Sequence, residues 1–129
     1  MAETDIRGAR QAIVAVFEAW ERDDAAGVAA LFADDGGYES PFFTETQVGR
    51  EAIEATVRGG MDEIRDLRIP IKHLAGEGDV AICEAGFLCE QSSGEGRLDF
   101  EFAMVVETRD GEITRLREFF DTRPLVTEG

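Results

Sequence analysis

The stretch that decides the fold lies at residues 31–41 and reads Leu-Phe-Ala-Asp-Asp-Gly-Gly-Tyr-Glu-Ser-Pro. Its apolar start is typical of a helix end, and the Gly-Gly pair is typical of a turn. The residues after the turn favour a short strand, which Pro41 closes because proline lacks the N–H of the ladder. A helix, a turn and a strand in this close order predict a fold that mixes helices and sheet.

Helices are predicted on both sides of this stretch. Apolar residues recur at helical spacing over 6–22, which indicates an amphipathic helix. Asp23 and Asp24 end this helix and can cap a second, short helix over 25–32. A third helix is predicted over 51–61, where a second Gly-Gly pair ends it.

The second half of the chain alternates with period two. This pattern predicts strands over 69–75, 80–90, 97–107 and 113–121, and the Gly-rich links between them imply antiparallel hairpins. The order of elements predicts an α+β fold, with three N-terminal helices packed on a curved, mostly antiparallel sheet. No linker or repeat interrupts it, so residues 1–129 are expected to form a single domain.

The composition limits the partners of the protein. Twenty-eight acidic residues face thirteen basic ones, for a net charge of −15, which excludes nucleic acid and anionic membranes as preferred partners. The acidity favours solubility or adaptation to high salt over attraction of a cationic ligand, because the acids are spread along the chain. No run is long enough for a membrane span, and the acidic start lacks the pattern of a secretion signal. We therefore expect a cytoplasmic protein.

The two cysteines and the glycines indicate neither a disulfide nor a cofactor. Cys83 and Cys89 lie six residues apart on one predicted strand, so their Cα atoms would be about 20 Å apart. Both are interpreted as small buried hydrophobic residues, because no ligand set for a metal surrounds them. The glycine pairs lie between predicted strands and open no helix, so no phosphate-binding loop is predicted.

Three segments carry a resemblance to a known family. They are residues 17–35 with the Asp-Asp helix break, Val48-Gly-Arg-Glu-Ala-Ile53, and Asp110-Gly-Glu-Ile-Thr-Arg-Leu-Arg-Glu-Phe-Phe-Asp121. With these segments the chain resembles the SnoaL-like family of the nuclear transport factor 2-like superfamily, which is similar to ketosteroid isomerase and limonene epoxide hydrolase. The resemblance covers nearly the whole chain. It implies a cone-shaped, cystatin-like fold with one pocket.

The resemblance also argues against the isomerase chemistry of this superfamily. The aspartate base of the isomerase falls on Ser40, its tyrosine on Val16 and its second acid on Ala103. Serine is no base at neutral pH, and valine and alanine donate no hydrogen bond. The mechanism that uses an Asp base with a Tyr and a protonated Asp is therefore not expected here.

The epoxide hydrolase pattern is retained in part. The closing strand resembles that of the hydrolase and places Glu118 on one acid of its catalytic set. The cooperating Arg and Asp should lie within 80–90, where this chain has Ala85, Gly86 and Phe87. Epoxide hydrolysis therefore remains an alternative in which another donor replaces the arginine.

Strand alternation predicts which side chains meet in the pocket. If Ser40 faces the cavity, as its isomerase counterpart does, then Tyr38 and Phe42 face it too, because side chains two apart share a face. The same choice places on the cavity side Ala81, Cys83, Ala85, Phe87, Cys89, Glu101, Ala103, Val105, Leu116, Glu118 and Phe120. The opposite face is expected to carry Val80, Ile82, Phe102, Met104 and Val106. A sheet that is apolar on both faces needs a second cover, so we predict a homodimer.

Glu118 is the leading catalytic candidate. It lies between Leu116 and Phe120 on a face that should be dry, where a carboxyl has a raised pKa and can act as a general acid or base. The alternative for Glu118 is a structural ion pair with Arg115 or Arg117.

Four further residues are candidates for catalysis. The single histidine, His73, is either a hydrogen-bonded core residue or a catalytic group oriented by a carboxylate. Tyr38 could donate to a substrate oxygen or only cap the cone. Glu101 has apolar strand neighbours, so its carboxylate must either bind a partner or face the pocket. Asp121, at the end of the last predicted strand, either takes part in catalysis or accepts hydrogen bonds from nearby backbone or arginine donors.

The residues expected to bind a ligand are mostly apolar. Trp20 fits either the core or a ligand platform, and Ser40 fits a polar lining group. The complete predicted set is Trp20, Ser40, Phe42, Cys83, Phe87, Ala103, Leu116 and Phe120.

These residues predict cofactor-independent acid–base catalysis on a small apolar or polycyclic molecule, as in a cyclase, isomerase or dehydratase. Epoxide hydrolysis of the limonene epoxide hydrolase type is one alternative. A binding protein for a small apolar ligand, without chemistry, is the other. The surroundings of Glu118 in the folded protein distinguish these three functions.

Overall fold

The computed structural model describes residues 8–123 as three helices and seven strands. The helices are α1 (Ala9–Glu21), α2 (Ala25–Ala30) and α3 (Arg50–Met61). The strands are β1 (Phe32–Glu39), β2 (Gln47–Val48), β3 (Ile64–Arg68), β4 (Ile71–Glu77), β5 (Val80–Gln91), β6 (Arg97–Arg109) and β7 (Glu112–Phe119). The first two residues of the helix predicted over 6–22 lie outside the described part of the chain.

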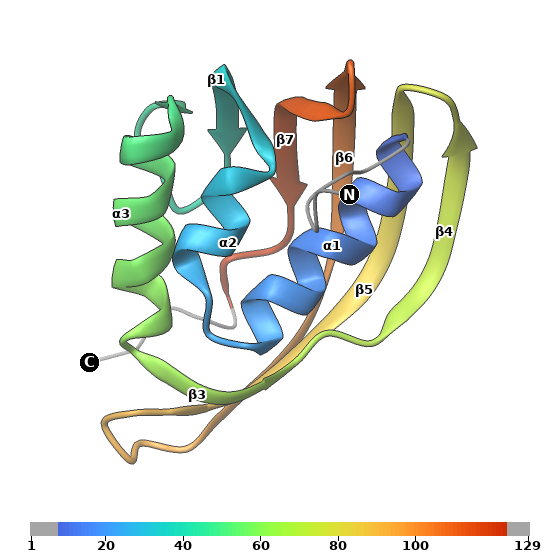
Figure 1. Cartoon of the computed structure of the whole chain (residues 1–129). Coiled ribbons are helices and arrows are strands. Elements are labelled where there is room, and N and C mark those ends of the chain that lie inside the picture. Colours follow the sequence, from blue (N-terminus) through green and yellow to red (C-terminus); the bar gives the residue numbers. More distant parts are fainter. Residues whose placement is uncertain (1–7, 124–129) are drawn as a thin grey trace.

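All seven strands form one curved sheet, and the three helices lie on one of its faces (Figure 1). The strand order is β2-β1-β7-β6-β5-β3, and β4 also pairs with β5. Every pair is antiparallel except β1 with β7. The fold is therefore the predicted α+β arrangement of helices on a curved, mostly antiparallel sheet.

The two long strands β5 and β6 carry the curvature. β4 pairs with the first half of β5 and β3 with its second half, and Pro70 lies between them. The backbone N–H of Gly86 donates to the carbonyl of Pro70, and a side chain at Gly86 would crowd the proline ring. The sheet bends at this junction, so its second half curls around the lower ends of the helices (Figure 1).

The predicted turn at the Gly-Gly pair is instead part of β1. The register of β1 against β7 shifts between Phe32 and Gly37, so the glycines form an irregularity within one strand. A Cβ at Gly36 would lie 2.7 Å from the carbonyl oxygen of Ile113, which explains why this close approach needs glycine. The second helix accordingly ends at Ala30, two residues earlier than predicted.

The core lies between α1 and the concave face of the sheet. Phe17 of α1 packs edge-on against Phe102 of β6, with ring centroids 5.8 Å apart. Met104 and Val106 continue the same face of β6 and are fully buried. The prediction that β6 turns Glu101, Ala103 and Val105 toward the helices was therefore wrong, and these three lie on the outer face.

The pairing of β6 with β7 explains this correction. Met104 is the direct partner of Glu118, and Val106 is the partner of Leu116. Residues directly opposite each other in a ladder share a face. Because Glu118 points inward, Met104 does as well, and Ala103 must point outward.

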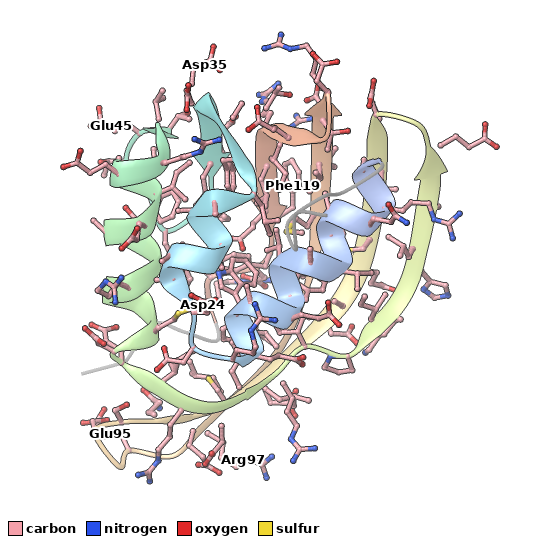
Figure 2. All side chains as sticks on the ribbon, in the orientation of Figure 1. Asp24, Asp35, Glu45, Glu95, Arg97 and Phe119 are labelled. Carbon is pink, nitrogen blue, oxygen red and sulfur yellow. The ribbon has the colours of Figure 1, made fainter. Side chains whose placement is uncertain are left out.

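Asp24 begins α2, as the sequence predicts (Figure 2). Its carboxylate accepts a hydrogen bond from the backbone N–H of Gly27 at 2.9 Å. We expect Asp24→Ala to lower the free energy of unfolding by about 1 kcal/mol, because this cap is lost. Glu18→Ala, which removes an exposed carboxylate from α1, is the control and should change the stability by less than about 0.5 kcal/mol. Urea denaturation of the two variants checks this, and equal effects would contradict the capping role.

Candidate functional site

A cavity of about 530 Å³ lies between the helices and the concave face of the sheet. Its wall is built by α1, α3 and five strands, together with the segment after β1 and the residue after β7. Eight of the residues that line it are aromatic: Trp20, Tyr38, Phe42, Phe43, Phe87, Phe100, Phe102 and Phe120. The volume suits a small organic molecule, since ligand pockets commonly span about 300–1,000 Å³.

The aromatic side chains support one another around the cavity. Phe120 contacts Phe42 and Phe100, with ring centroids 5.0 and 5.3 Å apart. Phe100 in turn lies 5.0 Å from Phe87. Phe42 is 62% exposed, so it lies where the cavity opens to solvent. The wall is thus largely formed before a ligand arrives.

Two carboxyl groups line this largely apolar wall, Glu118 of β7 and Glu63 in the segment between α3 and β3, and Glu118 is the predicted catalytic residue. Removal of the carboxyl from water raises its pKa from an ordinary 4.5 to about 7, and hydrogen bonds from the side chains of Ser40 and Tyr38 oppose part of that rise. Its side chain is only half-buried because it opens to the cavity. At neutral pH this group can either give or take a proton.

The parallel pairing of β1 and β7 brings these three residues together. Tyr38 is the direct partner of Leu116, so Ser40 reaches the level of Glu118 two residues further along. Tyr38 as a whole is 6% exposed. Burial, and then the charge of Glu118 and the hydrogen bond to it, raise the pKa of Tyr38 well above its usual range, so the phenol keeps its proton.

The arginines of β7 do not pair with Glu118. Arg115 binds Glu39 at 2.7 Å, and Arg117 lies 3.9 Å from Glu107, both on the outer face of the sheet. Among the described residues Glu118 has no ion pair. The structural alternative suggested for Glu118, a salt bridge to one of these arginines, is therefore wrong.

Three of the predicted catalytic residues lie outside the cavity. His73 is exposed on β4, and its Nδ1 lies 2.8 Å from an oxygen of Glu84. The register of β4 shifts between Ile71 and His73, which breaks the alternation that predicted a core position. His73 and Glu118 do not meet, and the expected placement of His73 in the pocket was wrong.

Glu101 and Asp121 are also separated from the cavity. Glu101 is exposed on the outer face of β6, where it forms an ion pair with Lys72. Asp121 follows β7 and binds Arg123 at 2.6 Å. Hydrogen bonds from Arg123 lower the pKa of Asp121 to about 2. Both carboxylates are thus ordinary surface ion-pair partners in this structure.

The predicted ligand-binding residues divide into three groups. Trp20, Phe42, Phe87 and Phe120 line the cavity as expected. Ser40 lies beside Glu118 and forms a side-chain hydrogen bond with it. The predicted pocket positions of Cys83, Leu116 and Ala103 were wrong, since the first two are buried in the core and Ala103 lies on the outer face.

Both cysteines are buried, as the sequence predicts. Cys83 and Cys89 are free and buried, and burial raises the pKa of the Cys83 thiol to about 11. Within residues 8–123, no group of three or more His, Cys, Asp or Glu side chains is arranged to hold a metal ion. No helix in that range is both long and apolar enough to cross a membrane.

Several lining residues were not predicted. Phe100 and Phe102 of β6 line the cavity because their face of the strand points inward, and Phe43 joins them from the segment after β1. The helix α3 contributes Val57 and Met61. The apolar alternation of β6 from Leu98 to Val106 carried this information, but the face assignment that started from Ser40 placed Ala103 inward and so reversed it.

A curved sheet with three helices on its concave face and an apolar cavity between the layers defines the nuclear transport factor 2-like class of fold. Within that class, the SnoaL-like domain profile matches residues 13–116. The chain belongs to the SnoaL-like family.

Solved structures of other proteins share this fold. A protein of Catenulispora acidiphila with a ketosteroid isomerase-like fold, in complex with trimethylamine, is 24% identical with a TM-score of 0.77, over 84% of each chain. A nuclear transport factor 2-like protein of Burkholderia pseudomallei is 20% identical with a TM-score of 0.78, over 97% of this chain and 95% of its own. An epoxide hydrolase of Mycobacterium tuberculosis, like limonene epoxide hydrolase, is 25% identical with a TM-score of 0.73, over 87% of this chain and 81% of its own. A search of curated proteins finds no match.

Proposed function

We propose that the protein performs cofactor-independent acid–base catalysis on a small apolar or polycyclic molecule bound in the cavity, as a cyclase, isomerase or dehydratase. Glu118 is the proton carrier in this proposal. The observation that supports it is the carboxyl group of Glu118, which has a pKa of about 7 and opens into a largely aromatic and apolar wall. A group whose pKa lies near the working pH is the most effective proton carrier.

The surroundings of Glu118 suit a reversible proton transfer. The ionised carboxylate can remove a proton from a carbon next to a carbonyl group, and the resulting acid can return it at a second carbon. The hydroxyl groups of Tyr38 and Ser40 hold the carboxylate in place through hydrogen bonds. Tyr38 keeps its proton at neutral pH. Once Glu118 has taken a proton from the substrate and is neutral, the phenol can turn its O–H from the carboxyl to a substrate oxygen on which negative charge develops.

The test is isotope incorporation in deuterated water enriched in heavy oxygen. Enolisable ketones, aldols and epoxides of a size that fits the cavity are incubated with the protein and analysed by mass spectrometry. Deuterium gain at carbon supports the proposal. No label above an enzyme-free control, across the panel, would contradict it and favour a binding protein without chemistry.

Epoxide hydrolysis is the second candidate function. The similarity to the epoxide hydrolase of M. tuberculosis and the position of Glu118 favour it. Against it, β5 contributes only Phe87 to the cavity wall, where an Arg and an Asp are expected to cooperate with the acid. Heavy oxygen in a diol product would favour this candidate over the first.

We also propose that the protein is a homodimer formed through the outer face of the sheet. On this face Ile82 and Phe119 are each 49% exposed, and Val105 lies directly opposite Ile82. A single domain over residues 1–129 and a cytoplasmic location remain predictions.

Sedimentation velocity tests the dimer. We expect the wild-type protein to sediment as a dimer and Ile82→Glu to sediment as a monomer, because a charge at this position opposes burial of the apolar face. Glu95→Gln, in the hairpin between β5 and β6, is the control and should remain dimeric (Figure 2). A monomeric wild-type protein would contradict the proposal.

A further inference from the structure

The charges of the cavity wall limit what can enter it. No Lys, Arg or His is among the described residues that line the cavity, and its charged members are Glu118 and Glu63. The protein as a whole carries a net charge of −15, which repels anions and attracts cations from a distance. An anionic ligand would meet two carboxylates and no compensating base, so the occupant is neutral or positively charged.

The groups that face Glu118 cannot compensate its negative charge. It meets Tyr38 of β1 and Ser40, the residue after β1, and the thiol of Cys83 on β5 interacts with it. Burial holds both the phenol and the thiol in the neutral form at pH 7. Its direct partner on β6 is Met104. An ionised carboxylate without a cation in an apolar wall is costly, and an organic cation is the group that would offset this cost.

Tyr38, which interacts with Glu118, and the two cavity-lining aromatic side chains packed around it suit a cation as well. Tyr38 lies 6.4 Å from Trp20 with the rings tilted at 43°, and 5.0 Å from Phe43 with the rings nearly perpendicular at 89°. The three rings therefore present surfaces in different directions in the part of the cavity wall around Tyr38. A cation within about 6 Å of such rings is attracted by their π-electrons, by up to about 2 kcal/mol when desolvated.

We propose that the cavity selects small organic cations, with an ammonium group placed between the carboxylate of Glu118 and the rings of Trp20, Tyr38 and Phe43. This inference names a substrate class for the site proposed above and rests on that site. It requires no covalent step. The apolar remainder of the ligand occupies the wall formed by Phe87, Phe100 and Phe120.

Such binding is linked to the proton of Glu118. A bound cation favours the ionised carboxyl, so binding at pH 7 releases about half a proton. The affinity for a permanent cation should therefore rise by up to about 100-fold between about pH 5 and pH 8 and then level off, because the carboxyl is already ionised there. An uncharged ligand of the same shape should lose affinity or stay constant over this range.

The test compares benzyltrimethylammonium with neopentylbenzene, its uncharged counterpart of the same shape. Trp20 is the only tryptophan and lines the cavity, so its fluorescence reports binding of both probes. We expect the cation to bind at least about ten-fold more tightly than the uncharged probe near pH 8, with this preference lost in Glu118→Gln and kept in Glu101→Gln. Benzenesulfonate should not bind.

Three results would overturn the inference: equal affinity for the two probes, a preference for the uncharged probe, or no binding of the cation. A cation preference that survives in Glu118→Gln, with the fold verified by circular dichroism, would also overturn it. The proposed function fails separately. Absence of isotope incorporation with a retained cation preference would leave a cation-binding protein, whereas incorporation without the preference would remove this inference alone.

Discussion

Replacement of Glu118 by glutamine is expected to reduce deuterium incorporation into any substrate of the protein by about 10²–10⁴-fold, the usual contribution of a positioned acid–base group. Glutamine has the same shape and can still accept from Ser40 and Tyr38, but it cannot exchange a proton with carbon. The loss should therefore appear in kcat, with KM changed much less. Initial rates measured by mass spectrometry over a range of substrate concentrations separate the two.

Glu101→Gln is the matched control for this prediction. It makes the same chemical change on the same sheet, but on the outer face, where Glu101 binds Lys72. We expect its rate to stay within about two-fold of the wild type, since exposed ion pairs contribute little. A Glu118→Gln variant that is folded and retains the wild-type rate would contradict the assignment of Glu118 as proton carrier.

The second large effect concerns stability and pH. We expect Glu118 to lower the free energy of unfolding by about 2–3 kcal/mol as the pH rises from about 5 to about 8. The folded-state pKa of Glu118 is raised to about 7, above its value in the unfolded chain near 4.5. Between these two values the folded state binds a proton that the unfolded state has released. The stability is therefore greatest at the acidic end of this range and falls as the pH approaches 7.

Urea denaturation of the wild type and Glu118→Gln across this range measures the effect as a difference. Hydrogen bonds from arginines lower the pKa of Glu39 and Asp121, so these groups titrate at more acidic pH and contribute with the opposite sign below this range. The two stability curves should converge at acidic pH and separate toward pH 8, where Glu118→Gln is the more stable protein. Parallel curves would show that the carboxyl of Glu118 is not desolvated.

Much of the fold follows from the sequence because its signals are local. Helical spacing, the Asp-Asp break and the turn-rich links predicted the three helices and the four long strands. Two short strands, β2 and β3, were missed, because neither alternates cleanly and β3 has an irregular register against β5. Local pattern carries little information about a strand whose pairing is interrupted.

The site was harder to predict because alternation defines two faces without saying which one is inward. On β7 the face was chosen from the expected inward orientation of Ser40, and the structure places Glu118 in the cavity wall as that choice predicts. On β6 both faces carry apolar residues, and only the pairing of Met104 with Glu118 distinguishes them. For His73 the cause is a register shift within β4, which no pattern of side chains reveals.

The most direct measurement is a carbon-13 NMR titration of the side-chain carboxyl of Glu118, assigned as the signal that is absent from Glu118→Gln. The predicted result is a midpoint near pH 7, as expected for a carboxyl held in the apolar wall of the cavity. A midpoint near 4.5, the ordinary value for glutamate, would contradict it. In that case Glu118 would be a solvated surface group, and the proposed acid–base role would no longer stand.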